Sequence, residues 1–331
     1  MVGLILDGKS ITGSYQVGAY YALKKCRVRY KAILGRGIGS FNAAMLTVKK
    51  SKLLRDIWTD STLKDILDLE DEMVVRFFKD NDLLEEGNLK NISTKKLEEG
   101  MKISNFSAFV RNNIKEEDIN SSKIEYSMIS LKKNKIEPIK LYSDNIKKGD
   151  LADYIVSSAY MPLLIGYDKS NPWMIPMLEK IGCEKIYYIN SDNVDYNFEK
   201  YDAEVIEIKP SLTFGHAFFD KENPLVNMRR GYLDTLKAFD KYDGDSYYFE
   251  KKKDSFYEKV TKYVDEELKN VTTVLLKSNS TKETVIKALE YMLNSAKQSN
   301  INIYNPKDVI RFGKTLKTRG IVFDFIRNLN I

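Results

Sequence analysis

Along the first third of the chain, short continuous apolar runs alternate with segments whose apolar residues have helical spacing. The apolar runs at residues 2–6 and 32–34 are short and continuous, as in strands that are buried on both faces of a sheet. Each run leads through a polar or glycine-rich stretch into a segment with helical spacing, at residues 13–23 and 41–49. This succession predicts two parallel strands joined by a right-handed helical crossover, and therefore an α/β fold with a mainly parallel sheet.

Further helices and strands are predicted after residue 50. The charged segment 61–120 has a helical pattern and is expected to add a layer over one face of the sheet. We expect a domain of residues 1–240 and a helical C-terminal region of residues 241–331, and from residue 223 onward the chain is expected to be nearly all helix. The other expected helices are 52–58, 151–159, 224–239, 254–276, 281–295 and 306–329 with a break near Gly320, and the expected strands are 123–131 and 136–142 as a hairpin, 185–190 and 204–208.

The composition predicts a globular protein and argues against nucleic-acid binding, membrane spans and secretion. The 331 residues are 43% hydrophobic, which is enough for a sizeable core. The net charge of +6 is compatible with an anionic surface as a partner but is too weak and too evenly spread to indicate nucleic acid. No apolar run approaches the roughly 20 residues that span a bilayer, and no secretory signal pattern opens the sequence. With Cys26 and Cys183 read as reduced thiols, we expect a cytoplasmic protein, in peripheral contact with membranes if its ligand is a lipid.

One glycine-rich turn, at residues 35–39, indicates where a catalytic site would lie. Gly35, Arg36, Gly37, Ile38 and Gly39 connect the second expected strand to the second expected helix. This is the layout of a nucleophile elbow, in which a sharp turn lifts one side chain above the sheet. Glycines suit such a turn because they tolerate positive φ and close approach of the backbone. The position that should carry the nucleophile is Gly37, which has no side chain.

Several stretches together resemble the patatin-like phospholipases. Residues 3–8 and 13–19 are similar to that family's first strand, its Gly-Gly-Gly-x-Arg-Gly loop and its Tyr-Gln-x-Gly helix. The turn at residues 35–39 stands where the family has Gly-x-Ser-x-Gly. The similarity covers roughly the first 240 residues, with weaker likenesses at 157–162, 168–176 and 231–234.

The resemblance implies a three-layer α/β/α sandwich with a mainly parallel sheet, here carrying a helical C-terminal extension. It also implies a Ser–Asp dyad that attacks a lipid ester, with an oxyanion held by backbone N–H groups of the glycine-rich loop. That chemistry needs no cofactor or metal, and the single histidine, His216, has no metal-ligand spacing around it and is expected to be a packed or surface residue. By resemblance, Asp168 is the dyad aspartate and the oxyanion loop contains Gly8, Lys9, Ser10 and Gly13.

The chain departs from this pattern at three motifs. Gly37 replaces the serine, Lys9 and Ser10 stand in place of loop glycines, and the Asp-Gly-Gly segment has become Asp168 followed by Lys169 and Ser170. Loss of one member of a catalytic unit typically costs factors of thousands or more in rate. We therefore expect a catalytically inactive member of the family that retains a crevice for a lipid, an acyl ester or a protein partner.

Two alternatives stay open. An active lipid acyl hydrolase could use a relocated nucleophile, Ser10 or Ser40, or the chain could be an inactivated form of such an enzyme. Ser40 is more simply a helix cap, and Cys26 a small buried apolar group. Arg36 is either a solvated turn residue or a phosphate ligand acting with the N-terminus of the helix at Ser40.

The second alternative belongs to a different class, a scaffolding protein that binds partners through residues 241–331. Its segment 254–268 has apolar residues at helical spacing, a pattern that more often marks a core than a partner surface. These residues are Phe256, Tyr257, Val260, Tyr263, Val264 and Leu268.

Overall fold

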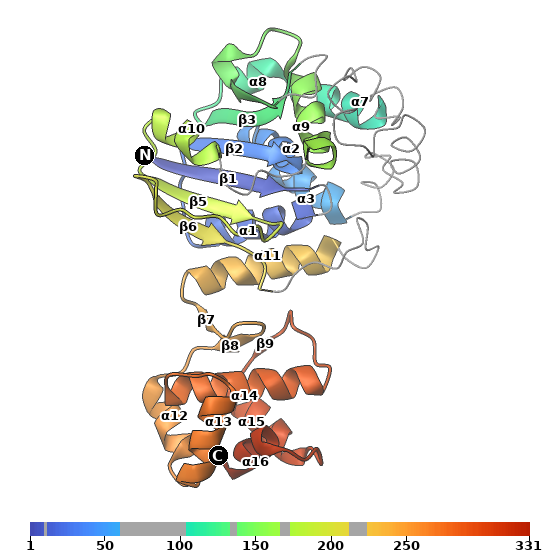
Figure 1. Cartoon of the computed structure of the whole chain (residues 1–331). Coiled ribbons are helices and arrows are strands. Elements are labelled where there is room, and N and C mark those ends of the chain that lie inside the picture. Colours follow the sequence, from blue (N-terminus) through green and yellow to red (C-terminus); the bar gives the residue numbers. More distant parts are fainter. Residues whose placement is uncertain (10–11, 60–103, 133–137, 166–172, 212–223) are drawn as a thin grey trace. The chain divides into compact units, whose positions relative to one another are not determined.

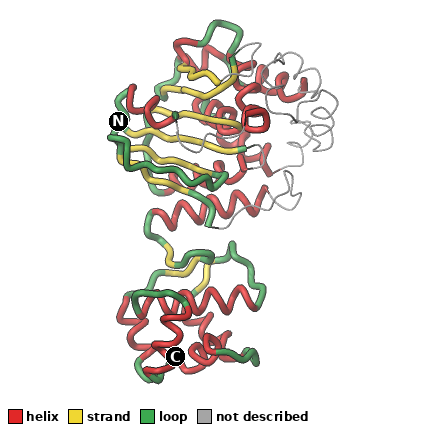
Figure 2. The backbone as a smooth tube through the Cα atoms, viewed as in Figure 1, coloured by secondary structure: helices red, strands yellow, loops and turns green. Residues whose placement is uncertain are grey.

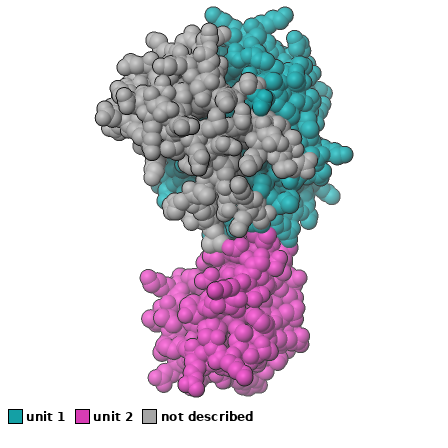
Figure 3. All heavy atoms as spheres, turned by 90° about the vertical axis from the view of Figure 1, so that its right-hand side faces the viewer, with its two compact units in different colours: residues 1–235 teal, residues 236–331 magenta. Residues whose placement is uncertain are grey.

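The computed structural model describes residues 1–9, 12–59, 104–132, 138–165, 173–211 and 224–331. They form two compact units, Met1–Thr235 and Leu236–Ile331, each with its own core. Figure 3 shows the two units in different colours. The residues that carry the sequence motifs discussed above all lie in the first unit.

The first unit is built on a six-stranded sheet (Figure 1) with strand order β4-β3-β2-β1-β5-β6. All neighbouring strands are parallel except β3 and β4, which form the predicted antiparallel hairpin. β1 and β2 are adjacent, with Leu4 opposite Ile33 and Gly8 opposite Gly37, so their carboxyl ends meet at one edge. The strands are β1 (Val2–Gly8), β2 (Ala32–Gly37), β3 (Glu125–Leu131), β4 (Pro138–Tyr142), β5 (Lys185–Asn190) and β6 (Glu204–Ile208).

Helices lie on both faces of this sheet, because successive side chains of a strand point to opposite sides. On β1, the Leu6 side faces α2, and a Cβ added at Gly39 of that helix would lie 2.0 Å from the Leu6 carbonyl oxygen. The Gly3 side faces α10, where Leu178 lies close to the Gly3 backbone. The described helices of this unit are α1 (Gly13–Lys25), α2 (Ile38–Thr47), α3 (Ser51–Thr59), α7 (Ser104–Asn113), α8 (Glu116–Asn120), α9 (Leu151–Ile165), α10 (Met174–Lys180) and α11 (Pro224–Ala238), whose last three residues belong to the second unit.

The second unit is mainly helical (Figure 2) and includes a small three-stranded sheet. Buried apolar side chains of four of its five helices and of the central strand of that sheet form one continuous core, and the partly buried Leu268 of the remaining helix packs against it. Its elements are β7 (Tyr242–Asp243), β8 (Tyr248–Glu250), α12 (Asp254–Thr261), α13 (Glu266–Leu275), α14 (Thr281–Ser295), β9 (Ile303–Tyr304), α15 (Pro306–Thr315) and α16 (Ile321–Asn328).

The predicted mainly parallel α/β sheet flanked by helices is confirmed, and the strands 185–190 and 204–208 and the helix 281–295 match their expected bounds. Two expectations for the second unit are wrong. The helix expected at 254–276 is two helices, because Asp265 starts a new one by accepting a hydrogen bond from the Leu268 amide. The unit is also not nearly all helix, since it contains β7, β8 and β9.

The apolar stripe on residues 254–268 is mostly core, as the pattern favoured. Tyr257, Val260 and Val264 are buried in the second unit, and Phe256 and Leu268 pack against them. Tyr263 is the exception, with 71% of its surface exposed. The expected layer at residues 61–120 is described only from residue 104 onward, where α7 and α8 are helical as predicted; residues 61–103 lie outside the described part of the chain.

A buried carboxylate holds one turn of the second unit. Glu290 of α14 accepts hydrogen bonds through Oε1 from the amides of Asp245 (2.7 Å), Ser246 (2.7 Å) and Tyr247 (3.0 Å). The turn begins at Gly244, whose φ of 104° suits glycine. Burial raises the pKa of Glu290 above its ordinary value, and the three amides offset only part of that effect.

Replacing Glu290 by alanine is expected to lower the stability of the second unit by about 2–4 kcal/mol, because three amides lose their acceptor. Replacing it by glutamine should cost less than about 1 kcal/mol, since an amide oxygen can accept the same bonds without carrying a buried charge. Because the pKa of Glu290 is raised in the folded state, the wild-type carboxylate should destabilise the unit as pH rises above 4.5, the ordinary pKa of a glutamate side chain. Hydrogen exchange of peptides from the second unit measures its stability in each variant. An equal change of stability with pH in wild type and Glu290→Gln would contradict the predicted effect of the carboxylate.

Candidate functional site

The elbow is built without a connecting loop. β2 continues through Gly37 and α2 begins at the next residue, Ile38, so the expected five-residue turn at 35–39 is wrong in its extent. Gly37 has φ 63° and ψ −139°, a backbone conformation that is strained for residues with a side chain. This is the bend that a nucleophile elbow requires, placed at the residue that should bear the nucleophile. The structure therefore shows an elbow-like bend at Gly37, a residue that carries no side chain.

The two flanking glycines, Gly35 and Gly39, are needed for close packing of the backbone and not for a positive φ angle. A Cβ at Gly35 would lie 2.3 Å from the Cα of Ser40, and one at Gly39 would lie 2.0 Å from the Leu6 carbonyl oxygen. Real Cβ atoms do not approach backbone so closely, so both positions need glycine to bring α2 onto β2 and β1. The glycine frame thus sets the angle at which α2 leaves the sheet.

Two buried serines hold the elbow from the interior. Ser40 donates from Oγ to the Gly37 carbonyl oxygen (2.7 Å), and the Ser158 hydroxyl also contacts that oxygen (3.4 Å) while donating to the Ile129 carbonyl (2.5 Å). The two hydroxyl oxygens also contact each other, so the two serines share their protons among these partners. The expectation that Ser40 caps the helix is wrong, because Gly37 is the N-cap residue and no side chain accepts from the first amides. Ser40 has no exposed surface, which disfavours it as a relocated nucleophile.

Arg36 forms a buried ion pair at the same edge of the sheet. Its Nε and Nη2 donate to the two carboxylate oxygens of Asp7, each at 2.7 Å, and Nη2 also donates to the Tyr196 hydroxyl. Tyr188 donates to Asp7 as well (2.7 Å). Burial alone would lower the pKa of Arg36, but the Asp7 carboxylate outweighs it and holds that pKa well above its ordinary value. The expectation that Arg36 is a solvated turn residue is therefore wrong, and its role as a phosphate ligand stays a prediction.

In the loop that the resemblance assigns to oxyanion binding, two described residues contact a carboxylate of the chain itself. The amide of Lys9 donates to both oxygens of Asp192, at 3.1 Å each. The hydroxyl of Thr12 contacts the same carboxylate (2.9 Å) and the Lys9 carbonyl (2.9 Å). Thr12 is the residue that replaces the basic side chain of the family motif. Asp192 therefore already accepts from the Lys9 amide, which is one of the backbone donors expected for an oxyanion.

Gly8 is required by this arrangement. A Cβ at Gly8 would lie 1.9 Å from the Ser191 hydroxyl and 2.4 Å from the Thr12 hydroxyl. Ser191 in turn donates to the Asp7 carbonyl at 2.8 Å. The loop after β1 and the loop after β5 are thus packed against each other with no space for a further side chain at Gly8.

A polar network continues from this loop into the helices behind the elbow. Gln16 donates to the Ser191 hydroxyl (3.2 Å) and accepts from Asn42 (2.8 Å). Asn42 also donates to the Gly13 carbonyl (3.0 Å) and accepts from the indole of Trp58 (3.0 Å). The Tyr-Gln-x-Gly motif of α1 therefore supplies Gln16 as a link between the β5 loop and α2.

Three residues considered in the sequence lie outside the described part of the chain: Asp168, Ser10 and His216. The structure therefore says nothing about the dyad aspartate or about Ser10 as a nucleophile. Of the two cysteines, Cys26 is partly exposed rather than buried as expected, and Cys183 is buried. Burial raises the pKa of the Cys183 thiol to about 11, so it is a neutral packing group at neutral pH.

Among the described residues, no group of three or more His, Cys, Asp or Glu side chains is arranged to hold a metal ion. In the same ranges, no helix combines the length and the apolar character needed to cross a membrane. Lys9 and Gly8 were predicted as loop residues; Asp192 and Ser158 were not assigned roles from the sequence. Asp192 follows β5, the neighbour of β1, and side chains after adjacent parallel strands meet at one edge, so strand order would have identified it.

Comparison with known proteins agrees with the architecture. A family model described as patatin-like phospholipase matches residues 4–201, more than half of the chain. The chain therefore belongs to the patatin-like phospholipase family. A search of curated proteins finds no match.

Similar solved structures include two bacterial proteins. The type III effector protein ExoU is 12% identical, over 98% of this chain and 72% of that chain, with a TM-score of 0.36. VipD from Legionella pneumophila is 14% identical, over 98% of this chain and 83% of that chain, with a TM-score of 0.35. A further structure contains ExoU from Pseudomonas aeruginosa in complex with SpcU, with 10% identity over 98% of this chain and 70% of that chain and a TM-score of 0.34.

Proposed function

We propose that this chain is a catalytically inactive patatin-like protein that keeps the crevice at the elbow as a binding site for a lipid or acyl ester. The observation that carries the proposal is Gly37, which has the strained backbone of a nucleophile elbow and no side chain. A glycine cannot form the acyl-enzyme intermediate on which this family's chemistry depends. The proposed location is the cytoplasm, with peripheral contact to membranes.

The oxyanion loop supports the same proposal independently. Stabilising an oxyanion requires preorganised donors that are free when the charge develops. In this chain the Lys9 amide already binds Asp192, and a second anion at that place would meet a carboxylate. Two requirements of acyl transfer, the nucleophile and the oxyanion donor, are therefore unmet within one site.

Esterase and phospholipase assays with short and long acyl chains test this proposal. Hydrolysis is expected to stay near the uncatalysed rate, and a fluorophosphonate probe should leave Ser40 unlabelled because its hydroxyl is buried. Labelling of Ser10 with matching turnover, abolished by Ser10→Ala, would instead establish the alternative of a relocated nucleophile. Retained binding is measured by flotation with neutral and anionic liposomes, and absence of binding to both would remove the lipid part of the proposal.

A second candidate function, protein interaction through the second unit, is favoured by an exposed apolar face on α13. Val271, Val274 and Leu275 lie at helical spacing and are 42%, 77% and 56% exposed. Affinity capture with wild type and with a Val274→Asp/Leu275→Asp variant tests this candidate. A partner that binds wild type alone supports it, and equal capture by both proteins counts against this face.

A further inference from the structure

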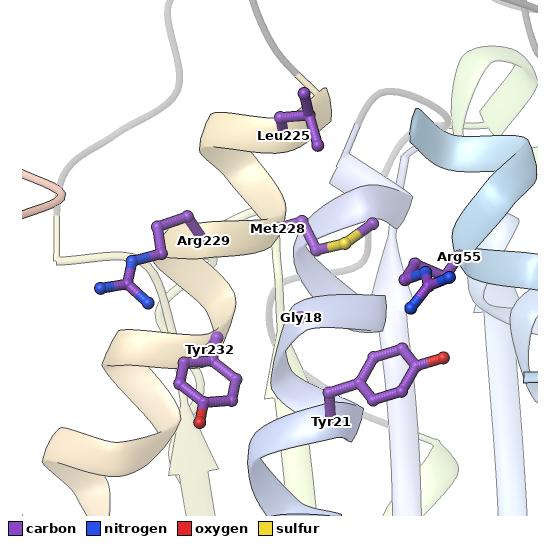
Figure 4. Close-up of a pocket in the computed structure, with 7 residues that line it drawn as sticks. All are labelled: Gly18, Tyr21, Arg55, Leu225, Met228, Arg229 and Tyr232. Carbon is purple, nitrogen blue, oxygen red and sulfur yellow. The ribbon is translucent and has the colours of Figure 1, made fainter. Parts of the chain in front are cut away.

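A groove lies on the first unit between α1, α3 and α11, and none of its lining residues belongs to the elbow or to the loop after β1 (Figure 4). Its volume is about 340 Å³, near the lower end for specific ligand sites. The backbone of Gly18 forms part of its wall. The side chains that line it are those of Tyr21, Arg55, Leu225, Met228, Arg229 and Tyr232.

Two glycines fix the shape of this groove. A Cβ at Gly18 of α1 would lie 1.8 Å from the Met228 carbonyl oxygen, and a Cβ at Gly231 of α11 would lie 2.0 Å from the Tyr15 carbonyl oxygen. The two helices therefore touch backbone to backbone. Asp234 adds a buried link, since it accepts hydrogen bonds from the Tyr15 hydroxyl (3.1 Å) and the Ser211 amide (3.2 Å). The groove is consequently a preformed feature of the helix pair.

The lining combines apolar, aromatic and cationic groups. Leu225 is 57% exposed, and Met228 lies near it on α11. The ring of Tyr232 has the Lys25 ammonium 5.6 Å and the Arg229 guanidinium 6.0 Å from its centroid. In Figure 4 the side chains of Arg229 and Arg55 stand on either side of Met228. Each end of the groove therefore carries a guanidinium group, with an apolar surface between them.

The three helices concentrate positive charge. Their two acidic residues are Asp56 and Asp234, and Asp234 is buried against Tyr15. Asp56 pairs with Arg55 at the surface, where such pairs contribute little and are easily exchanged. The basic residues of α1, α3 and α11 are Lys24, Lys25, Lys52, Arg55, Arg229, Arg230 and Lys237. Seven basic residues against two acidic ones give these helices a local charge of +5, in a chain whose net charge is +6.

We propose that this groove binds an acidic segment of a partner protein, with one large apolar side chain against Met228 and Leu225 and carboxylates on Arg55 and Arg229. The charge of the three helices is complementary to such a segment. Tyrosine, arginine and methionine are also the residue types enriched at the centres of protein interfaces. The proposal goes beyond the crevice at the elbow and does not depend on it.

The full-length chain is used to select binders from a phage-displayed library of random 12-residue peptides. The selected consensus is expected to contain an apolar residue flanked by Asp or Glu. Its synthetic, fluorescein-labelled form should bind wild type at least 10-fold more tightly than an Arg55→Glu/Arg229→Glu variant, as measured by fluorescence anisotropy. Changing the peptide's carboxylates to amides should weaken binding to wild type by a similar factor.

The matched control is Lys259→Glu/Lys314→Glu, which changes the net charge equally at two exposed positions of the second unit. It should bind the peptide like wild type, and circular dichroism verifies that both variants are folded. Three results would overturn the proposal: no selected binder, a consensus without acidic residues, or equal binding by the groove variant. Flotation with phosphatidylcholine vesicles containing 30% phosphatidylserine tests whether the groove binds a membrane. Vesicle binding lost only in the groove variant would assign the groove to a membrane instead.

Discussion

Replacing Arg36 by leucine is expected to lower the free energy of unfolding of the first unit by about 3–5 kcal/mol, because Asp7 would keep a buried charge without its cation. Asp7 is 2% exposed and Arg36 is 7% exposed, so water cannot take over the role of the guanidinium. Tyr188 and Tyr196 would remain as donors, but neither supplies a positive charge. This is the largest stability effect that we expect from a single substitution near the elbow.

Urea unfolding followed by tryptophan fluorescence measures this effect, since both tryptophans, Trp58 and Trp173, lie in the first unit. The matched control is Arg111→Leu, which removes an arginine from the largely exposed pair with Asp153 and should cost about 1 kcal/mol or less. Arg36→Lys should lie between the two, because lysine keeps the charge and loses the two parallel hydrogen bonds. A loss below about 1 kcal/mol for Arg36→Leu would show that the pair is not the stabilising element described here.

The Arg36–Asp7 ion pair and the hydrogen bonds between Lys9 and Asp192 both use polar groups of the chain at the same edge of the sheet. Asp7 and Asp192 both stand at the carboxyl edge of the sheet, and the chain satisfies each of them with its own groups. In an acyl hydrolase such an edge presents unsatisfied donors and a reactive oxygen to the substrate. Here the Lys9 amide is bonded within the chain and Gly37 carries no hydroxyl, and both features support the proposed role in binding without hydrolysis.

The sequence allowed the central fold to be predicted where local pattern and tertiary structure agree. β1 and β2 are continuous apolar runs in a sheet covered on both faces, and Ser280 with Glu283 forms a helix start for α14 that can be recognised locally. Strands β7, β8 and β9 could not be predicted, because each has only two or three residues and too few positions to show alternation. The pairing of β8 with β9 also joins distant parts of the chain, since Tyr248 lies opposite Ile303.

The sequence allowed the position of the elbow to be predicted, but not the partners that its neighbouring residues contact. The glycine spacing identified the elbow, because Gly35, Gly37 and Gly39 are each required by backbone geometry. The partner of Arg36 was not predictable, since Asp7 is 29 residues away and meets it only through the register of β1 with β2. The contact of Asp192 with Lys9 joins residues 183 positions apart and depends on the order of β1 and β5 in the sheet. Such contacts follow from strand order, which no local pattern contains.

Restoring a serine at the elbow is expected to be insufficient for activity, and freeing the Lys9 amide should then raise it. Gly37→Ser supplies the nucleophile at a cost of about 1–3 kcal/mol in stability, because φ 63° is strained for a residue with a side chain. Its hydrolysis of a short-chain ester should stay near background while Asp192 occupies the amide. Adding Asp192→Ala should increase the rate about 10²-fold over Gly37→Ser, the size of effect that one oxyanion donor typically contributes.

Initial rates with a chromogenic short-chain ester measure this increase, after circular dichroism has verified that each variant is folded. The matched control is Gly37→Ser/Asp195→Ala, which removes an equal charge from the same loop at a residue whose side chain is 98% exposed. Its rate should equal that of Gly37→Ser alone, and Gly37→Ala/Asp192→Ala should stay at background because it has no nucleophile. Robust turnover by Gly37→Ser alone would mean that the loop still binds an oxyanion. In that case the missing hydroxyl would be the single defect of an otherwise competent hydrolase, and Asp192 would be a structural residue that yields to the substrate.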